Sequence, residues 1–165
     1  ALSVYGKNYS AGSAIPPRAA LDTLNYTEAA LKEALRKYSV VPTVVRLASE
    51  DVVVGKYFIP KGTSVMLLIQ GVHQRPDIWE NPMKYEPRRF LEDVPLYHFL
   101  GFIEGPRNCL GQYLSLLETK TVLSTLVHRF KFTIENENAN ERHPYIEPIV
   151  PHHGLFVRVS DHKYK

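Results

Sequence analysis

The stretch Phe102-Ile103-Glu104-Gly105-Pro106-Arg107-Asn108-Cys109-Leu110-Gly111 holds the only cysteine of the chain. It lies in a glycine-bracketed segment directly before the longest helical pattern of the sequence, an apolar stripe that predicts a helix from Leu110 to Phe130. Backbone N–H groups at a helix start, together with the cation of Arg107, favour a thiolate at Cys109. A lone cysteine is more often an inert buried residue, so the surrounding residues decide between the two interpretations.

Outward from this loop, the sequence predicts one more helix and two groups of short strands. Asn25 is a candidate cap with Glu28 three residues on, and the apolar stripe that follows predicts a helix ending before Pro42. Apolar runs separated by glycine and proline predict strands between residues 43 and 68, and two terminal strands at residues 131–134 and 155–159. Five prolines between residues 74 and 111 predict an extended meander.

Composition limits the class of protein. The chain has 165 residues with 20 Lys and Arg against 17 Asp and Glu, spread without a basic block, so nucleic acid is not the expected partner. One cysteine excludes an internal disulfide and a four-cysteine zinc site. The longest strongly apolar run, residues 65–69, is far shorter than a membrane helix, so the chain as given is expected to be soluble. Residues 1–24 lack either period and are interpreted as loop.

The cysteine segment matches a ten-residue pattern, Phe-x-x-Gly-x-Arg-x-Cys-x-Gly. At average residue usage this pattern arises by accident in about one chain of this length in tens of thousands. It resembles the haem-ligand signature of the cytochrome P-450 family at every fixed position. The resemblance implies that Cys109 is the axial thiolate ligand of a haem iron, a ligand that pushes electron density toward O–O cleavage.

A second motif, Glu33-x-x-Arg36, lies on the first predicted helix. Such a motif is common by accident, and the plain interpretation is an exposed i,i+3 pair opposite the Leu31/Leu35 stripe. Its order ahead of the 57–63 strand segment, the 79–90 meander and the cysteine loop is the order of landmarks in the family. The resemblance implies that Glu33, Arg36 and Arg89 form a buried ion triad.

The sequence departs from the family pattern at two places near these motifs. Arg88 adds a positive charge beside Arg89, which implies either that Arg88 faces solvent or that the pairing differs. Gly101 stands where a proline is common, and this substitution is expected to loosen the turn before Phe102.

Further residues carry weaker predictions by resemblance. Arg107 and Arg46 match positions that hold haem propionates, although plain surface charge is the alternative. Phe102 is expected near the sulfur, and Gly105 and Gly111 are expected to admit the porphyrin, although both could simply form turns. A substrate pocket is expected along two segments, with core strand and hairpin turn as equal alternatives; its candidate residues are Val41, Val44, Val45, His153 and Leu155.

The resemblance implies a mainly α fold with small β-sheets (α+β). In chain order it consists of a helix, a short-strand sheet, an extended meander, the Cys-ligand loop, a long helix and a terminal β-hairpin. Residues 25–165 would form the C-terminal haem-thiolate part of a monooxygenase domain that is incomplete here. The Gly-x-x-Thr helix that delivers protons in the family has no counterpart in this sequence, and we expect the chain alone to be inactive.

For the parent protein, the resemblance implies a haem-dependent monooxygenase that activates O2 and inserts one oxygen atom into an apolar substrate. Electrons would come from NADPH through a flavoprotein reductase or another donor. Candidates for docking it are Lys120, Arg129 and Lys131, with a solvated helix face as the equal alternative. The family's microsomal members place the parent protein at the cytosolic face of the endoplasmic reticulum membrane, held by an upstream segment. Two alternatives stay open: a non-enzymatic haem- or partner-binding module, and an inactive fragment with uncovered apolar faces.

Overall fold

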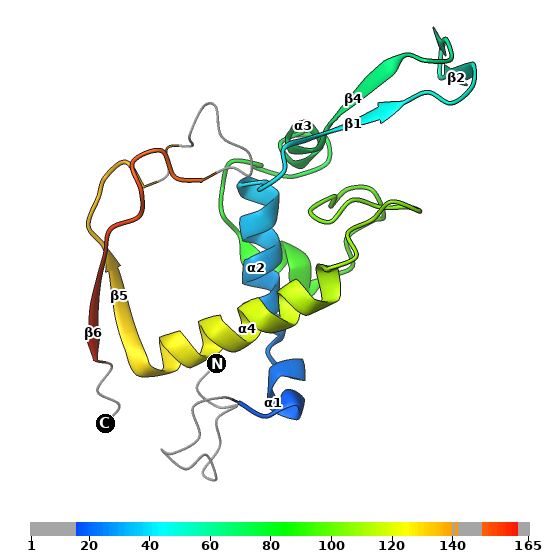
Figure 1. Cartoon of the computed structure of the whole chain (residues 1–165). Helices are drawn as coiled ribbons and strands as arrows, with labels where there is room; N and C mark the ends of the chain where they lie inside the picture. Colours follow the sequence, from blue (N-terminus) through cyan, green and yellow to red (C-terminus); the bar gives the residue numbers. More distant parts are fainter. Residues whose placement is uncertain (1–15, 140, 142–149, 162–165) are drawn as a thin grey trace.

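Two helices cross at the centre of the structure, a computed structural model that describes residues 16–139, 141 and 150–161 (Figure 1). They are α2, Asn25–Lys37, and α4, Gln112–Arg129, and they contact each other directly. Three shorter helical segments accompany them: α1 at Arg18–Asp22, α3 at Ile69–His73, and the 3-10 helix η2 at Pro87–Leu91. Helix η2 packs closely against α2.

The helix starts differ from those that the sequence predicts. Asn25 is the first residue inside α2, Leu24 occupies the cap position, and no side chain caps the helix. The Glu28 carboxylate instead binds Lys32 and Lys120, so the predicted capping box is wrong. The interpretation of residues 1–24 as loop is wrong for α1, while residues 1–15 lie outside the described part of the chain.

In the part of the chain that the structure describes, six strands form three separate antiparallel pairs. Strand β1, Thr43–Leu47, pairs with β4, Ser64–Leu68, in the register Thr43 to Leu68. Between them, β2, Val52–Val54, and β3, Tyr57–Ile59, form a hairpin whose turn contains Gly55 with a φ of 59°. Strand β5, Phe130–Ile134, continues directly from α4 and pairs with β6, Val157–Asp161. The predicted strands are therefore present, as pairs rather than one sheet.

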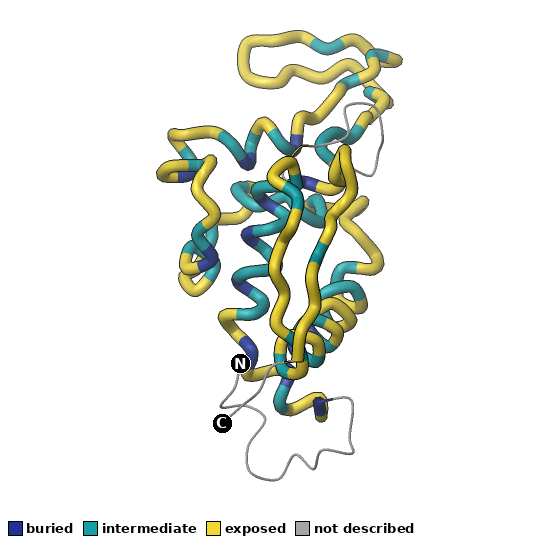
Figure 2. The backbone as a smooth tube through the Cα atoms, turned by 90° about the vertical axis from the view of Figure 1, so that its left-hand side faces the viewer, coloured by how far each residue is buried: buried dark blue, intermediate teal, exposed yellow. Residues whose placement is uncertain are grey.

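The core of the described residues is small and unusually polar. Its buried apolar side chains are Leu21, Leu24, Ala29, Ile69 and Trp79. Glu33, Arg36 and His73 are fully buried alongside them. Figure 2 shows the strand pairs largely exposed and the buried positions on the helices and the loops next to them. The part of the molecule that excludes water best is thus built around charged and polar groups.

The α+β class predicted from the sequence is confirmed, since helices and small antiparallel sheets alternate along the chain. The meander over residues 74–111 is irregular apart from η2, as five prolines require. Helix α3 was not predicted, because five residues are too few to establish a helical period.

Candidate functional site

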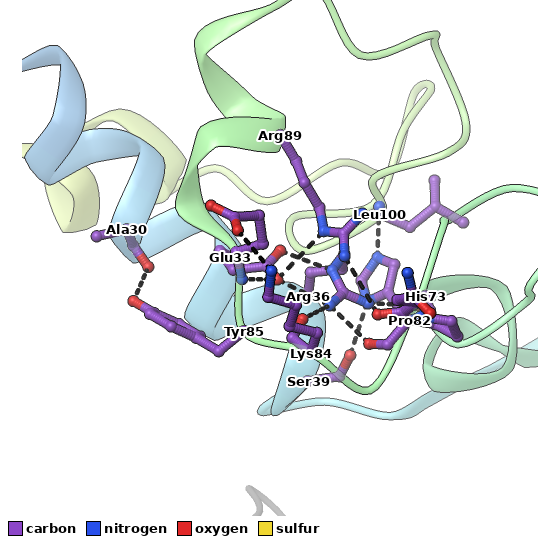
Figure 3. Close-up of polar contacts among 12 residues, drawn as sticks. Ala30, Glu33, Arg36, Ser39, His73, Pro82, Lys84, Tyr85, Arg89 and Leu100 are labelled. Atoms are coloured by element: carbon purple, nitrogen blue, oxygen red, sulfur yellow. Dashed lines mark hydrogen bonds and ion pairs between the residues drawn. The ribbon is translucent and has the colours of Figure 1, made fainter.

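A cluster of charged side chains lies where α2 meets the meander (Figure 3). Arg36 donates from Nε to Glu33 Oε2 at 2.7 Å and from Nη2 to Glu33 Oε1 at 2.8 Å, a bidentate pair. Both side chains are 0% exposed. The interpretation of Glu33 and Arg36 as an exposed surface pair is therefore wrong, and α2 turns a charged side toward the protein interior.

Arg36 also reaches three backbone carbonyls beyond its own helix. Nη1 donates to the carbonyl of His73 at 2.6 Å, and Nη2 lies 2.8 Å from the carbonyl of Pro82 and 3.3 Å from that of Lys84. Its guanidinium lies 5.1 Å from the centre of the Trp79 ring, within cation–π range. One side chain thus joins α2, α3 and the meander, and its five N–H donors suit this arrangement.

Arg89 brings η2 into the same cluster. Its Nε lies 3.5 Å from Glu33 Oε1, and its Nη2 donates to the Asn81 carbonyl at 3.2 Å. The backbone N–H of Glu86 also donates to Glu33 Oε1 at 2.8 Å. Glu33, Arg36 and Arg89 therefore meet in space, and the neighbouring Arg88 is exposed, which decides between the two interpretations of the added charge.

His73 is a second buried polar centre, and the sequence patterns gave it no role. Its Nδ1 lies 2.8 Å from Ser39 Oγ, and its Nε2 lies 2.8 Å from the backbone nitrogen of Leu100. Burial, and then the cation of Arg36, lower the pKa of His73 to about 4. Ser39 lies 34 positions before His73 and Leu100 lies 27 positions after it, so no local pattern could have predicted these two contacts.

The cysteine loop is closed by its own backbone. The Cys109 N–H donates to the Phe102 carbonyl at 2.8 Å, and the Gln112 N–H at the start of α4 lies 3.3 Å from the Cys109 carbonyl. Ile103 and Gly105 have positive φ angles of 61° and 90°. Cys109 is a free, exposed cysteine. The geometry holds the backbone of Cys109 and leaves its side chain accessible.

The other residues of the predicted haem site are on the surface or near it. Arg107 is exposed and, in the described ranges, has no ion-pair partner. Arg46 lies on β1, where its Nη1 donates to the Val45 carbonyl at 2.9 Å. A Cβ built on Gly111 would lie 3.9 Å from Cys109 Sγ, whereas one on Gly105 would meet open space. No described contact joins Arg46 to the cysteine loop.

Gly101 fits its surroundings through a neighbouring ring. A Cβ at position 101 would lie 2.5 Å from the ring of Phe99. Phe99 stacks on His73 with ring centroids 5.5 Å apart, so its ring occupies the space that any larger residue at position 101 would need. Gly101 therefore accommodates a packed ring, which differs from the loose turn that the sequence suggested.

The candidate substrate-pocket residues are not brought together in the described structure. Val41 and Val45 are about half exposed, and Val44 pairs with Leu67 across the β1–β4 sheet. His153 lies 3.1 Å from Glu141, and Leu155 is exposed ahead of β6. In Figure 1 the β1–β4 pair and the β5–β6 pair lie on opposite sides of α2.

An apolar groove of about 400 Å³ runs between α2, α4 and the cysteine loop. The Leu31, Ala34, Leu35 and Tyr38 stripe lines one wall, and Leu116 and Phe102 contribute to the others. The stripe that predicted α2 therefore faces this groove instead of a packed core. Phe102 connects the groove to the loop that carries Cys109.

Lys120 does not belong to an exposed basic surface. It is 7% exposed, and its Nζ lies 2.9 Å from Glu28 Oε2, so it joins α4 to α2. Hydrogen bonding from Lys32, and less strongly from Lys120, lowers the pKa of Glu28 against the opposing effect of burial. The suggestion that Lys120 docks an electron donor is therefore wrong, whereas Arg129 and Lys131 are exposed.

Within the described ranges, no helix has the length and apolar character needed to cross a membrane. Helix α4 is the longest there, and it carries charged side chains along its length.

Comparisons with known proteins agree on one family. The cytochrome P-450 family model matches residues 9–151. Cytochrome P-450 4c21 of Blattella germanica is 37% identical over 78% of this chain and 26% of its own length. Cytochrome P-450 4A10 of Mus musculus is 40% identical over 67% of this chain and 22% of its own length. A cytokinin hydroxylase of Arabidopsis thaliana is 33% identical over 93% of this chain and 29% of its own length.

A solved structure supports the same conclusion. The retinoic acid-bound cyanobacterial CYP120A1 superimposes with a TM-score of 0.81 at 27% identity, covering 87% of this chain and 35% of that one. The chain spans about a quarter of the length of the curated relatives it matches. With the family model matching most of its residues and relatives above 30% identity, the chain belongs to the cytochrome P-450 family.

Proposed function

We propose that this chain forms the haem-ligating part of a monooxygenase and that Cys109 is the axial ligand of the haem iron. The observation that carries the proposal is the accessible Cys109 thiol at the start of α4, inside the Phe-x-x-Gly-x-Arg-x-Cys-x-Gly pattern at residues 102–111. The proposal covers the protein that contains this chain, which would use O2 and insert one oxygen atom into an apolar substrate.

The residues around the thiol fit a flat, apolar, doubly acidic group. Gly111 lacks a Cβ that would lie 3.9 Å from the sulfur. Leu110, which follows Cys109, and Leu114, in the first turn of α4, are 102% and 63% exposed, so exposed apolar surface near the start of α4 is available for a porphyrin ring. The exposed guanidinium of Arg107, without an ion pair among the described residues, suits a propionate.

Each of these residues has a separate task in the proposed site. A thiolate-ligated haem supplies the electron push that favours cleavage of the O–O bond. Cys109 provides the sulfur, and the Phe102 carbonyl fixes its backbone through the 2.8 Å hydrogen bond. Phe102 would lie beside the ligand, Arg107 would hold one propionate, and Arg46 would hold the other. Gly105 lets the loop turn at a φ of 90°.

The remaining parts of the proposal concern groups that this chain meets in the full protein. Val41, Val44 and Val45 would form one wall of the substrate pocket, with His153 and Leu155 on a second segment. The electrons would come from NADPH through a flavoprotein reductase or another donor, with exposed Arg129 and Lys131 as docking candidates. From the eukaryotic relatives, we also propose that this segment is the C-terminal part of its protein. We propose from the same relatives that the protein is attached to the endoplasmic reticulum membrane.

The experiment compares the full-length protein with its Cys109→Ser variant. The ferrous carbon monoxide complex of the unmodified protein is expected to give a red-shifted, thiolate-type Soret band. In the variant that band is expected to disappear, because a serine hydroxyl is not a thiolate donor. A thiolate-type band that survives Cys109→Ser would refute the assignment. As a matched control, Ser115→Ala alters a hydroxyl on α4 that only binds its own helix, and should keep the band.

A further inference from the structure

His73 occupies the junction between the charge cluster and the cysteine loop (Figure 3). It is 0% exposed. Its backbone carbonyl accepts a hydrogen bond from Arg36, while its ring bonds Ser39 after α2 and Leu100 ahead of the cysteine pattern. One residue thus connects three segments that are far apart in the sequence.

The two ring contacts determine which nitrogen of His73 carries the proton. The backbone nitrogen of Leu100 can only donate, so Nε2, at 2.8 Å, must be the unprotonated acceptor. A neutral ring then carries its proton on Nδ1 and donates it to Ser39 Oγ, also at 2.8 Å. Burial beside the Arg36 cation keeps the ring neutral at physiological pH, consistent with a pKa of about 4.

From Leu100 the hydrogen bonds continue to Cys109. The Leu100 carbonyl accepts from the N–H of Ile103 at 3.0 Å, and the Phe102 carbonyl accepts from the N–H of Cys109 at 2.8 Å. The His73 ring also stacks on the ring of Phe99, which fills the space left by Gly101. His73 therefore holds the start of the cysteine loop by one hydrogen bond to Leu100 and one ring contact to Phe99. The ring of Phe90 packs on Phe99 as well, with centroids 4.9 Å apart.

We propose that His73 is a positioning residue for Cys109: its neutral ring fixes the start of the cysteine loop on the charge cluster, so that the sulfur is presented in one place. The inference deepens the proposed function, on which its ligand-related part rests. The fixing of the loop itself does not need haem, and it can be measured separately.

Two substitutions separate the contacts of the ring. Gln at position 73 can place its Oε1 near the position of Nε2, which keeps an acceptor for Leu100. Asn is one methylene shorter and can reach Ser39, but it leaves the Leu100 N–H without its acceptor. Both variants replace an aromatic ring by an amide of the same chemistry, so their difference reports mainly the hydrogen bond to Leu100.

The first measurement is amide hydrogen exchange in the full-length protein without haem. A buried N–H that loses its acceptor should exchange on the order of tenfold faster or more, because the loop that contains it opens more often. We expect this increase over residues 98–111 in His73→Asn and a much smaller one in His73→Gln. Residues 115–127 of α4 serve as the internal reference, with unchanged exchange.

The second measurement is the ferrous carbon monoxide spectrum of the haem-loaded variants. A loosely held thiol should ligate less completely, so His73→Asn should lose most of the thiolate-type band while His73→Gln keeps most of it. Rescue by glutamine distinguishes positioning through Leu100 from a general loss of stability, which would affect both variants alike.

The outcomes separate this inference from the proposed function. Equal exchange over residues 98–111 in His73→Asn and His73→Gln would overturn the inference, whatever the spectrum. Faster exchange in His73→Asn, with no thiolate-type band even in the unmodified protein, would support the loop contact and refute haem ligation. If His73→Asn does not fold, Ser39→Ala decides, since it removes the hydroxyl that fixes the ring. Unchanged loop exchange in that variant would overturn the inference.

Discussion

The two sides of α2 are packed in opposite ways. One side carries Glu33 and Arg36, which are completely buried against the meander. The other carries the Leu31/Leu35 stripe, which lines an open groove between α2 and α4. The charged side is therefore the one that fixes this helix, because its polar groups find partners in α3 and at two places in the meander. On this helix, the large side chains that are fully buried are those that find hydrogen-bond and ion-pair partners, and not the leucines of the stripe.

Removing one member of the charged side should give the largest effect. In Arg36→Met, the Glu33 carboxylate would lose its bidentate partner while staying buried, and three carbonyls would lose a donor. The expected loss in unfolding free energy is about 3 to 5 kcal/mol, measured by urea denaturation of the full-length protein. Lys32→Met is the matched control on the same helix, and loss of its ion pair, whose side chains are 30% and 33% exposed, should cost under about 1 kcal/mol. Equal losses would contradict the contrast between the two sides.

Acid should lower the stability of the folded chain through His73, which lies in the charged cluster and not in the groove. The pKa of His73 is lowered from 6.5 to about 4, so between these values the unfolded chain binds a proton that the folded chain does not. Stability therefore falls as the pH drops from 6.5 toward 4, by about 3 kcal/mol at the lower end. Arg36 and Glu33 are the charged groups that act on this ring.

Denaturation curves between pH 4 and pH 7 would measure this dependence. His73→Gln should flatten the curve, because glutamine does not titrate. A slope that stays the same in His73→Gln would mean that other groups cause the loss.

In the cysteine loop, backbone conformation should matter more than packing. Gly105 has a φ of 90° and open space around it, so alanine would meet no neighbour there. Gly105→Ala is expected to cost about 1 kcal/mol, because a side chain disfavours positive φ. The paired variant is Gly111→Ala, where φ is −86° and a new Cβ only touches the sulfur. Thermal unfolding should detect a lowered midpoint for Gly105→Ala and little change for Gly111→Ala.

A similarly small effect is expected on the apolar stripe itself. Leu35 is partly exposed in the groove, so Leu35→Ala should cost roughly 1 kcal/mol, about half the value for a fully buried leucine. The measurement is urea denaturation of the 165-residue chain and, separately, of the full-length protein. A cost of several kcal/mol in the full-length protein alone would mean that another segment covers the groove there.

Local patterns predicted much of this structure. Glycine and proline positions mark the ends of β1 to β4, and an unbroken stripe predicts α4, because both depend on nearby residues. The order of motifs, through the family resemblance, predicted an ion triad of Glu33, Arg36 and Arg89. The side of α2 that is buried was not predictable from its own stripe, since burial depends on carbonyls 37 to 48 residues away.

His73 illustrates the same limit for the site. Nothing near it in the sequence indicates that Ser39 and Leu100 will bind its ring. The assignment of Lys120 to the surface failed for a similar reason, because a lysine on a helix is usually exposed and only the position of Glu28 on α2 buries it. In each case the partner comes from a distant element.

The carbonyls bound by Arg36 restrict insertions and deletions. Because one guanidinium contacts residues 73, 82 and 84, the chain between them must have a fixed number of residues to present all three oxygens. Adding or removing one residue there would displace at least one carbonyl from its donor. The exposed β2–β3 turn at Gly55 has no such restriction. Length differences among related chains should therefore concentrate in the β2–β3 turn and avoid the segment from His73 to Lys84.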